Sequence, residues 1–279
     1  MLSVKKDFYR FVQYLGVIFG VLFSIYMAWF TYNYYHEKQK AQLETASEEI
    51  VLLIKNRMLT YEQVLRSGIA FFKSSDEVSR EDWKLFTKEH DLNKNFRGIQ
   101  GFGYSEVVLP KDKQNHEKKI QNEGFSDFKI HPSGKRELYT SIIYLEPFDI
   151  RNIRAFGYDM FSEKNRRVAM TKAVETGEPS LSAKITLVQE FSTDIQAGFL
   201  MYLPLYKKGY KLNSKADRMA AIQGFVYAPF RANDLMNGVL GKRFPNIDFE
   251  IYDGNIINNI ANIFSSIFYT FKAVFFWLK

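Results

Sequence analysis

The chain contains no cysteine, so disulfide bonds and thiolate metal sites are excluded and stability has to come from packing. Its four histidines do not pair at metal-ligand spacing, and no H-E-x-x-H motif occurs. Ser105 lies in G-Y-S-E-V, which lacks the second glycine of a nucleophile elbow. We therefore expect no metal, no cofactor and no catalytic residues, and a protein that is not an enzyme.

A basic stripe with interleaved aromatic residues is also missing. The net charge is +7, but lysines and arginines alternate with acids in runs such as KDKQNHEKK and SEKNRR, as on a solvated surface. This pattern speaks against a nucleic-acid partner. Hydrophobic residues make up 46% of the chain, which is enough to bury a core.

An uncharged apolar run occupies residues 11–32, FVQYLGVIFGVLFSIYMAWFTY. About 20 such residues cross a bilayer as a helix. Lys5, Lys6 and Arg10 precede the run, which predicts that residues 1–10 are cytoplasmic and that the bulk of the chain lies outside. A cleaved signal peptide is the alternative; no small-x-small cleavage site closes the run, so we favour a membrane span.

Residues 33–73 are predicted to continue this helix as a stalk. Apolar residues recur at the three-to-four spacing of one buried helical stripe; they are Ile50, Ile54, Met58, Tyr61, Leu65, Gly68 and Phe72. The stripe has two interpretations that spacing does not separate. It packs on its own domain, or it forms the seam of a dimer that carries movement to the membrane.

Strands and short helices alternate after the stalk. Ser79 with Asp82 three positions later predicts a capped helix start, and Gly177 ends a predicted helix over residues 167–177. A polar helix is predicted over residues 111–124 and another over residues 231–240. Alternating or β-rich runs predict strands over residues 98–109, 125–131, 138–147, 180–188, 197–206, 220–230 and 246–254. This order predicts an α+β fold with antiparallel sheets of the PAS type.

The stretch from Tyr144 to Glu190 carries a family signature. Its three parts read EPFDIRNIRAFGYDM, RRVAM and TGEPSLSAKITLVQE. HDLNKNFRGIQGFGYSEVV, from His90, and GFLMYLPLY, from Gly198, extend the likeness, which covers roughly residues 45–254. The chain resembles the CHASE domain, the extracytoplasmic ligand-sensing module of bacterial sensor kinases and cyclases and of plant cytokinin receptors.

The resemblance implies two stacked PAS-like subdomains, of which the second is incomplete here. We expect the distal subdomain over residues 74–206 and the start of a membrane-proximal one over residues 207–254. The resemblance also favours the stalk stripe as the seam of a homodimer. Signalling would then need a kinase or cyclase output module, which this chain lacks and a separate protein would have to supply.

Charged residues among large apolar ones mark a candidate site in RNIRAFGYDM. An aspartate matching Asp159 and a leucine matching Leu181 contact the hormone in plant members of the family, so the resemblance implies ligand contacts for these two residues. Arg151 and Arg154 are further candidates, for an anionic ligand group. The structural alternative is an internal Arg–Asp pair, or a capping aspartate ahead of the helix at Arg166.

The last segment, residues 255–279, departs from the family. Residues 256–278 are long enough to span a membrane, but Asn258, Asn259, Asn262 and Lys272 interrupt them. A second span, a membrane-surface helix and a truncated reading frame remain as alternatives. Together these features predict an inner-membrane protein with a periplasmic or extracellular sensor for a small molecule. The alternatives are a membrane-tethered binding or scaffold protein without a signalling role, and a remnant of a longer sensor kinase or diguanylate cyclase.

Overall fold

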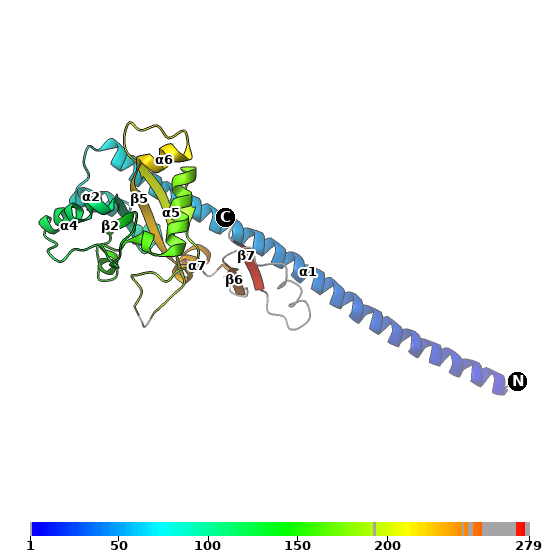
Figure 1. Cartoon of the computed structure of the whole chain (residues 1–279). Coiled ribbons are helices and arrows are strands. Elements are labelled where there is room, and N and C mark those ends of the chain that lie inside the picture. Colours follow the sequence, from blue (N-terminus) through cyan, green and yellow to red (C-terminus); the bar gives the residue numbers. More distant parts are fainter. Residues whose placement is uncertain (1, 192–193, 242, 245–247, 253–271, 277–279) are drawn as a thin grey trace. The chain divides into compact units, whose positions relative to one another are not determined.

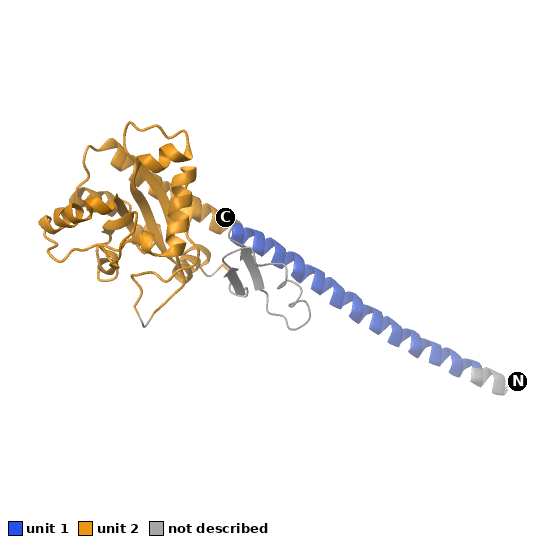
Figure 2. Ribbon diagram, viewed as in Figure 1, with its two compact units in different colours: residues 1–51 blue, residues 52–279 orange. Residues whose placement is uncertain are grey.

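The computed structural model describes residues 2–191, 194–241, 243–244, 248–252 and 272–276. The chain divides into two compact units, residues 1–51 and residues 52–279, which Figure 2 colours separately. The second unit holds a five-stranded sheet with helices around it (Figure 1). A long helix at the N-terminus followed by an antiparallel sheet and short helices confirms the predicted α+β class.

Helix α1 (Leu2–Ser74) is 73 residues long. In the first unit, the large apolar side chains between Phe8 and Tyr35 are at least 42% exposed. Such a continuous apolar surface on a helix has the length and composition needed to cross a bilayer. Among the described residues α1 is the one helix that meets these criteria, which a signal sequence near the N-terminus would also meet.

The main sheet is antiparallel throughout, with strand order β2-β1-β5-β4-β3. Its strands are β1 (Phe102–Val108), β2 (Tyr139–Glu146), β3 (Ser180–Leu181), β4 (Gly198–Tyr206) and β5 (Ile222–Arg231). Long strands β4 and β5 pair along their whole length, from Gly198 opposite Arg231 to Tyr206 opposite Ile222.

The remaining elements are short. The helices are α2 (Arg80–Glu89), α3 (Leu92–Asn95), α4 (Lys113–Asn122), α5 (Lys164–Thr176), α6 (Lys215–Ala221) and α7 (Ala232–Leu240). The 3-10 turns are η1 (Pro110–Asp112), η2 (Asn152–Ala155) and η3 (Met160–Ser162). Ser79 and Asp82 cap α2 reciprocally, as predicted, and Gly177 ends α5 with a positive φ of 78°.

One face of the sheet packs against the end of α1 and against α2. The ring of Trp83 on α2 lies 5.0 Å from that of Phe102 on β1. A Cβ atom at Gly68 of α1 would lie 2.9 Å from Phe102 and 3.0 Å from Val226. A larger residue at position 68 would therefore have to displace the Phe102 and Val226 side chains.

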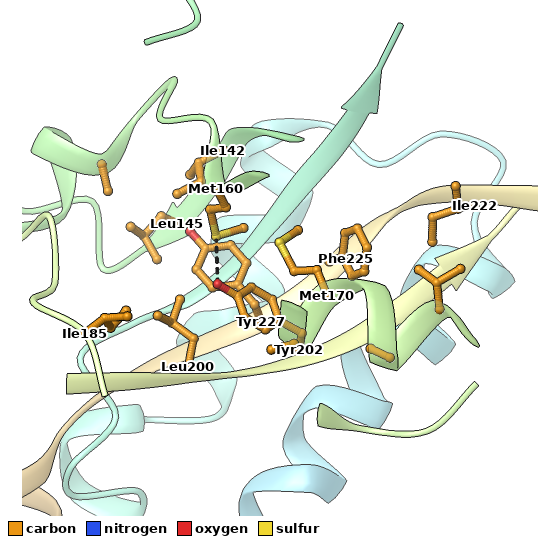
Figure 3. Packing of buried hydrophobic residues seen from close by; sticks show 14 of the residues in the cluster. Ile142, Leu145, Met160, Met170, Ile185, Leu200, Tyr202, Ile222, Phe225 and Tyr227 are labelled. Atoms are coloured by element: carbon orange, nitrogen blue, oxygen red, sulfur yellow. Dashed lines mark hydrogen bonds between the residues drawn. The ribbon is translucent and has the colours of Figure 1, made fainter. Parts of the chain in front are cut away.

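The opposite face, here called the α5 face, is covered by α5, η3 and the connection between β3 and β4. Side chains from these elements and from the three strands β2, β4 and β5 form one apolar cluster (Figure 3). Ala169, Met170 and Ala173 stand at positions i, i+1 and i+4, which share one helix face, and are at most 3% exposed. Glu163 caps α5 by accepting hydrogen bonds from the main-chain N–H groups of Asn165 and Arg166.

Two expectations about the organisation of the chain need correction. We expected a second subdomain to begin at Lys207, but β5 lies between β1 and β4 in the first sheet, so that boundary does not separate two sheets. We also favoured the stalk stripe as the seam of a homodimer, but members of the stripe pack within their own chain. Tyr61 and Leu65 are fully buried within the chain, and the Tyr61 hydroxyl donates a hydrogen bond to the carbonyl of Arg97.

Little of the C-terminal segment belongs to the described residues. Lys272–Phe276 form β7, which pairs in parallel with β6 (Asp248–Tyr252). The rest of residues 255–279, where a second membrane helix is one alternative, lies outside the described residues.

Candidate ligand-binding site

Four Asp, Glu, Lys or Arg side chains are more than nine-tenths buried among the described residues: Asp159, Arg166, Glu190 and Arg231. Three of them have an oppositely charged partner. Arg231 pairs with Glu190 at 2.8 Å, and Asp159 lies 3.2 Å from Arg136. Arg166 makes no ion pair within the part of the chain that the structure describes, which makes it the unusual member of the group.

Arg166 is placed by the third position of α5, on the buried face of that helix. It is 2% exposed. Its guanidinium lies over the Tyr158 ring, 5.0 Å from the centroid, and Nη2 has a long contact of 3.4 Å with the carbonyl of Thr186. Its Nε atom is buried without a hydrogen-bond acceptor. The guanidinium is thus oriented by packing and keeps unused donor capacity.

Two tyrosines from neighbouring strands lie beside this arginine. Tyr202 on β4 and Tyr227 on β5 are opposite each other in the ladder, and their ring centroids are 6.2 Å apart (Figure 3). The Tyr202 hydroxyl contacts the Met160 sulfur at 3.5 Å and also interacts with Arg166. Burial raises the pKa of both phenols, so both remain neutral hydroxyls.

The α5 face also carries two hydroxyls without partners. The Tyr227 hydroxyl is buried and makes no hydrogen bond to the described residues, and the same holds for Ser105 Oγ on β1. The Tyr227 ring lies over Gly103, where a Cβ atom would lie 2.6 Å from its Cζ. Gly103 and Ser105 share one face of β1 because side chains alternate along a strand. Arg166, Ser105 and Tyr227, here called the polar cluster, are therefore buried on the α5 face and have unused hydrogen-bonding capacity.

Asp159, the first predicted site residue, is fully buried at the start of η3. Its Oδ1 accepts hydrogen bonds from the main-chain N–H groups of Thr140 (2.8 Å) and Phe161 (3.1 Å). Arg136 approaches Oδ2 at 3.2 Å without hydrogen-bond geometry. Burial raises the pKa of Asp159, while these hydrogen bonds and Arg136 act in the opposite direction.

Both parts of the structural alternative for Asp159 are thus present, with other partners than expected. The aspartate caps η3 rather than α5, and its arginine is Arg136 rather than Arg151 or Arg154. Its Oδ2 keeps unused acceptor capacity. A ligand contact at Asp159 stays a prediction.

A groove of about 1020 Å³ lies next to this aspartate, and Arg136 and Phe161 belong to its lining. The groove also takes residues from α4, from the end of β1 and from α6, including His116, Lys119 and Met219. Arg136 thus contacts the Asp159 carboxylate and also belongs to the lining of the groove.

The other predicted residues lie elsewhere. Leu181 is half-buried on edge strand β3, opposite Met201. The guanidinium groups of Arg151 and Arg154 both lie over the Phe191 ring, at 5.2 and 5.1 Å. Arg154 donates to the carbonyl of Glu190, at 2.8 Å. The structure therefore brings the two arginines together, and their described contacts do not include Asp159.

The polar cluster around Arg166 was not predicted from the sequence. One signal was available, because Arg166 stands three, four and seven positions before Ala169, Met170 and Ala173. That spacing places it on the apolar face of the helix. The strand residues Ser105, Tyr202 and Tyr227 gave no such signal, since their meeting depends on the strand order.

Comparison with known proteins gives three findings. Residues 76–263, more than half of the chain, match the family model of the CHASE domain. Histidine kinase 3 of Arabidopsis thaliana is 21% identical over 260 residues, which cover 85% of this chain and 24% of that protein. The chain thus spans about a quarter of that relative's length.

Among solved structures, the periplasmic sensory domain of the Campylobacter jejuni chemoreceptor Tlp1 is similar over 74% of this chain and 61% of that chain. Its sequence identity is 14% and its TM-score 0.30, which is too low to support an argument.

Proposed function

The chain belongs to the CHASE domain family, and on that premise we propose that it is the extracytoplasmic sensor of a signalling system and binds a small molecule on the α5 face. The observation that carries this proposal is the polar cluster. Leaving a buried hydrogen-bonding group without a partner costs about 1–3 kcal/mol. The polar cluster contains three such groups, Arg166 Nε, Ser105 Oγ and Tyr227 Oη. A ligand that forms hydrogen bonds with them would remove this cost.

The proposal includes a membrane anchor. The exposed apolar surface of α1 between Phe8 and Tyr35 supports a span, and Lys5, Lys6 and Arg10 in front of it support a cytoplasmic N-terminus. The CHASE domain would then lie on the periplasmic or extracellular side of an inner membrane. The sheet packs directly on the end of α1, which supports a route from the ligand to the membrane.

Ligand binding would signal by favouring one of two arrangements of α1 in a homodimer. A ligand shifts such an equilibrium only through different affinities for the two states. Output would come from a kinase or cyclase, in keeping with the histidine kinase relative. A membrane-tethered binding protein without signalling remains the second candidate.

Asp159 and Leu181 belong to this proposal as ligand contacts at the edge of the same subdomain. For Oδ2 of Asp159 to accept a hydrogen bond from a ligand, Arg136 would have to move into the groove. Arg151 and Arg154, which hold Phe191 and the main chain of Glu190, would act on the connection between β3 and β4 that covers the α5 face.

The test is a thermal-shift screen of small molecules on the full chain in detergent micelles. A ligand at one hundred times its dissociation constant stabilises the fold by about 2.7 kcal/mol. The shift should disappear in Tyr227→Leu and persist in Tyr210→Leu, a matched control because Tyr210 is 55% exposed. Ligands that stabilise both variants equally would place the binding site outside the α5 face.

A further inference from the structure

We infer that the ligand carries a single carboxylate group and that Arg166 binds it. This inference rests on the proposed function, because it names the chemistry that the α5 face would recognise. Its starting point is the contrast among the buried charges: Asp159, Glu190 and Arg231 each have a partner of opposite charge, and Arg166 has none among the described residues.

An unpaired buried cation is costly for a fold. Burial removes the guanidinium from water, and only a counter-charge or a full set of acceptors compensates for the lost hydration. The nearest acid along the chain is Glu163, whose two carboxylate oxygens accept the N–H groups of Asn165 and Arg166 at the start of α5. Glu163 is therefore engaged as a cap and leaves the guanidinium without a counter-ion.

The guanidinium is positioned for a planar anion. Its Cζ lies over the Tyr158 ring, 5.0 Å from the centroid, and the free Nε lies on the edge of the group. Arginine recognises a carboxylate through two parallel N–H donors, and such charge-assisted bonds are about twice as strong as neutral ones. The contact of Nη2 with the Thr186 carbonyl is long, at 3.4 Å, so a ligand oxygen could replace that carbonyl as the acceptor.

The surroundings favour one negative charge on an apolar body. Arg166 is the one cation of the polar cluster. Its single positive charge can neutralise a carboxylate but not a phosphate dianion. The hydroxyls of Tyr227 and Ser105 add neutral donors for the same group or for a second oxygen. Met160 and Met170, both fully buried, are flexible apolar side chains that can contact the apolar part of the ligand.

The first experiment needs no ligand. The full chain is purified in detergent, dialysed exhaustively, and compared by thermal unfolding with Arg166→Met and Lys172→Met. If the Arg166 guanidinium has no counter-ion in the absence of ligand, methionine removes an unpaired charge. The midpoint of thermal unfolding should then rise by roughly 2–4 °C. Lys172, exposed on the same helix, is the control and should change it little. A clearly lower midpoint for Arg166→Met alone would make Arg166 a structural residue and overturn the inference.

The second experiment uses monocarboxylates, from butyrate to decanoate and from benzoate to phenylpropionate, each paired with its primary amide. At least one acid should stabilise the wild type where its amide does not. Arg166→Met should weaken that acid roughly 10- to 100-fold, Arg166→Lys should weaken it less, and Lys172→Met should leave it unchanged.

These experiments distinguish failure of the carboxylate inference from failure of the sensor proposal. If only neutral compounds stabilise the chain, or if acids bind Arg166→Met as well as the wild type, the carboxylate inference fails while the sensor proposal stands. If neither the acids, the amides nor the wider screen described above shifts the wild type, both fail together.

Discussion

The Nε atom of Arg231, at the end of β5, lies 2.8 Å from Oε1 of Glu190 in the connection between β3 and β4, and both side chains are more than nine-tenths buried. Arg231 also reaches the carboxylates of Asp194 and Asp234, at 2.5 and 2.6 Å. This network fastens the connection that covers the α5 face to the central strand of the sheet.

Replacing Glu190 with glutamine should therefore destabilise the fold. Removing one partner of a buried pair costs roughly 3–5 kcal/mol because the other charge stays buried. We expect about 2–3 kcal/mol here, since Asp194 and Asp234 remain. Urea unfolding measures the change. Asp194→Asn, at an acid whose side chain is 50% exposed, is the control and should unfold closer to the wild type; equal losses in both variants would contradict a special role for Glu190.

Asp159 should tolerate asparagine and not alanine. Asparagine keeps an oxygen for the N–H groups of Thr140 and Phe161, and it removes a charge that burial disfavours. We expect Asp159→Asn to stay within about 1 kcal/mol of the wild type at pH 7, and Asp159→Ala to lose about 1–3 kcal/mol because it leaves buried donors unpaired. Equal losses in the two variants would show that the negative charge itself holds the fold.

The pH dependence of the same pair follows from the pKa of Asp159, which is raised in the folded chain. A raised pKa means that the folded state binds the proton more readily than the unfolded state. The wild type should therefore gain stability relative to Asp159→Asn as the pH falls from neutral towards the ordinary aspartate value of 3.8. Chemical unfolding of both variants between pH 7 and pH 4 measures this; a relative loss on acidification would show that Arg136 outweighs burial.

The sequence predicted individual helices and strands better than it predicted which strands pair with each other. The cap at Ser79, the end of α5 at Gly177 and strands β1, β2, β4 and β5 all follow from local patterns. The strand expected over residues 180–188 is short because the Ser182 hydroxyl accepts the N–H of Leu200, at 3.0 Å. The side chain thus occupies a donor that a continued ladder would have used.

Residues 125–131 show the same effect. They were predicted as a strand, but their main chain is satisfied by side chains of α4. Gln121 donates to the carbonyl of Phe128, and Glu117 accepts the N–H of Ile130. Local patterns do not reveal such substitutions. Nor do they reveal that β5 pairs with β1, which lies more than one hundred residues earlier, so the polar stretch after Tyr206 looked like a boundary.

The hydroxyl of Tyr227 should be dispensable for stability in the absence of ligand. It makes no hydrogen bond among the described residues, whereas the Tyr144 hydroxyl donates to the carbonyl of Val78 at 2.8 Å. Tyr144→Phe should cost about 1 kcal/mol, and Tyr227→Phe should be neutral or slightly stabilising. Parallel urea titrations decide the point; a cost at Tyr227 equal to that at Tyr144 would mean that its hydroxyl already has a partner.

The proposed topology predicts the behaviour of reporter fusions. Because Lys5, Lys6 and Arg10 precede the apolar run, the N-terminus should stay in the cytoplasm and the domain should be exported. Alkaline phosphatase fused after Gly254 should be active, and a cytoplasmic fluorescent reporter fused there should be dark. Exchanging the three basic residues for glutamine should reduce the phosphatase signal. A bright cytoplasmic reporter would reverse the orientation.

Homodimer formation through the stalk has to use a different face of α1 than the one we first expected. Tyr61 and Leu65 are buried against the chain's own domain, so charges there would unfold it. Leu52 and Leu59 are seven positions apart and 57% and 58% exposed. This spacing places both on one side of a helix and suits a helical seam.

The double exchange Leu52→Glu with Leu59→Glu should leave the midpoint of thermal unfolding nearly unchanged and shift a dimer to monomers in analytical ultracentrifugation. Tyr61→Glu should instead lower the midpoint sharply, because it buries a charge without a partner. A dimer that survives both leucine exchanges would place the seam elsewhere on the chain.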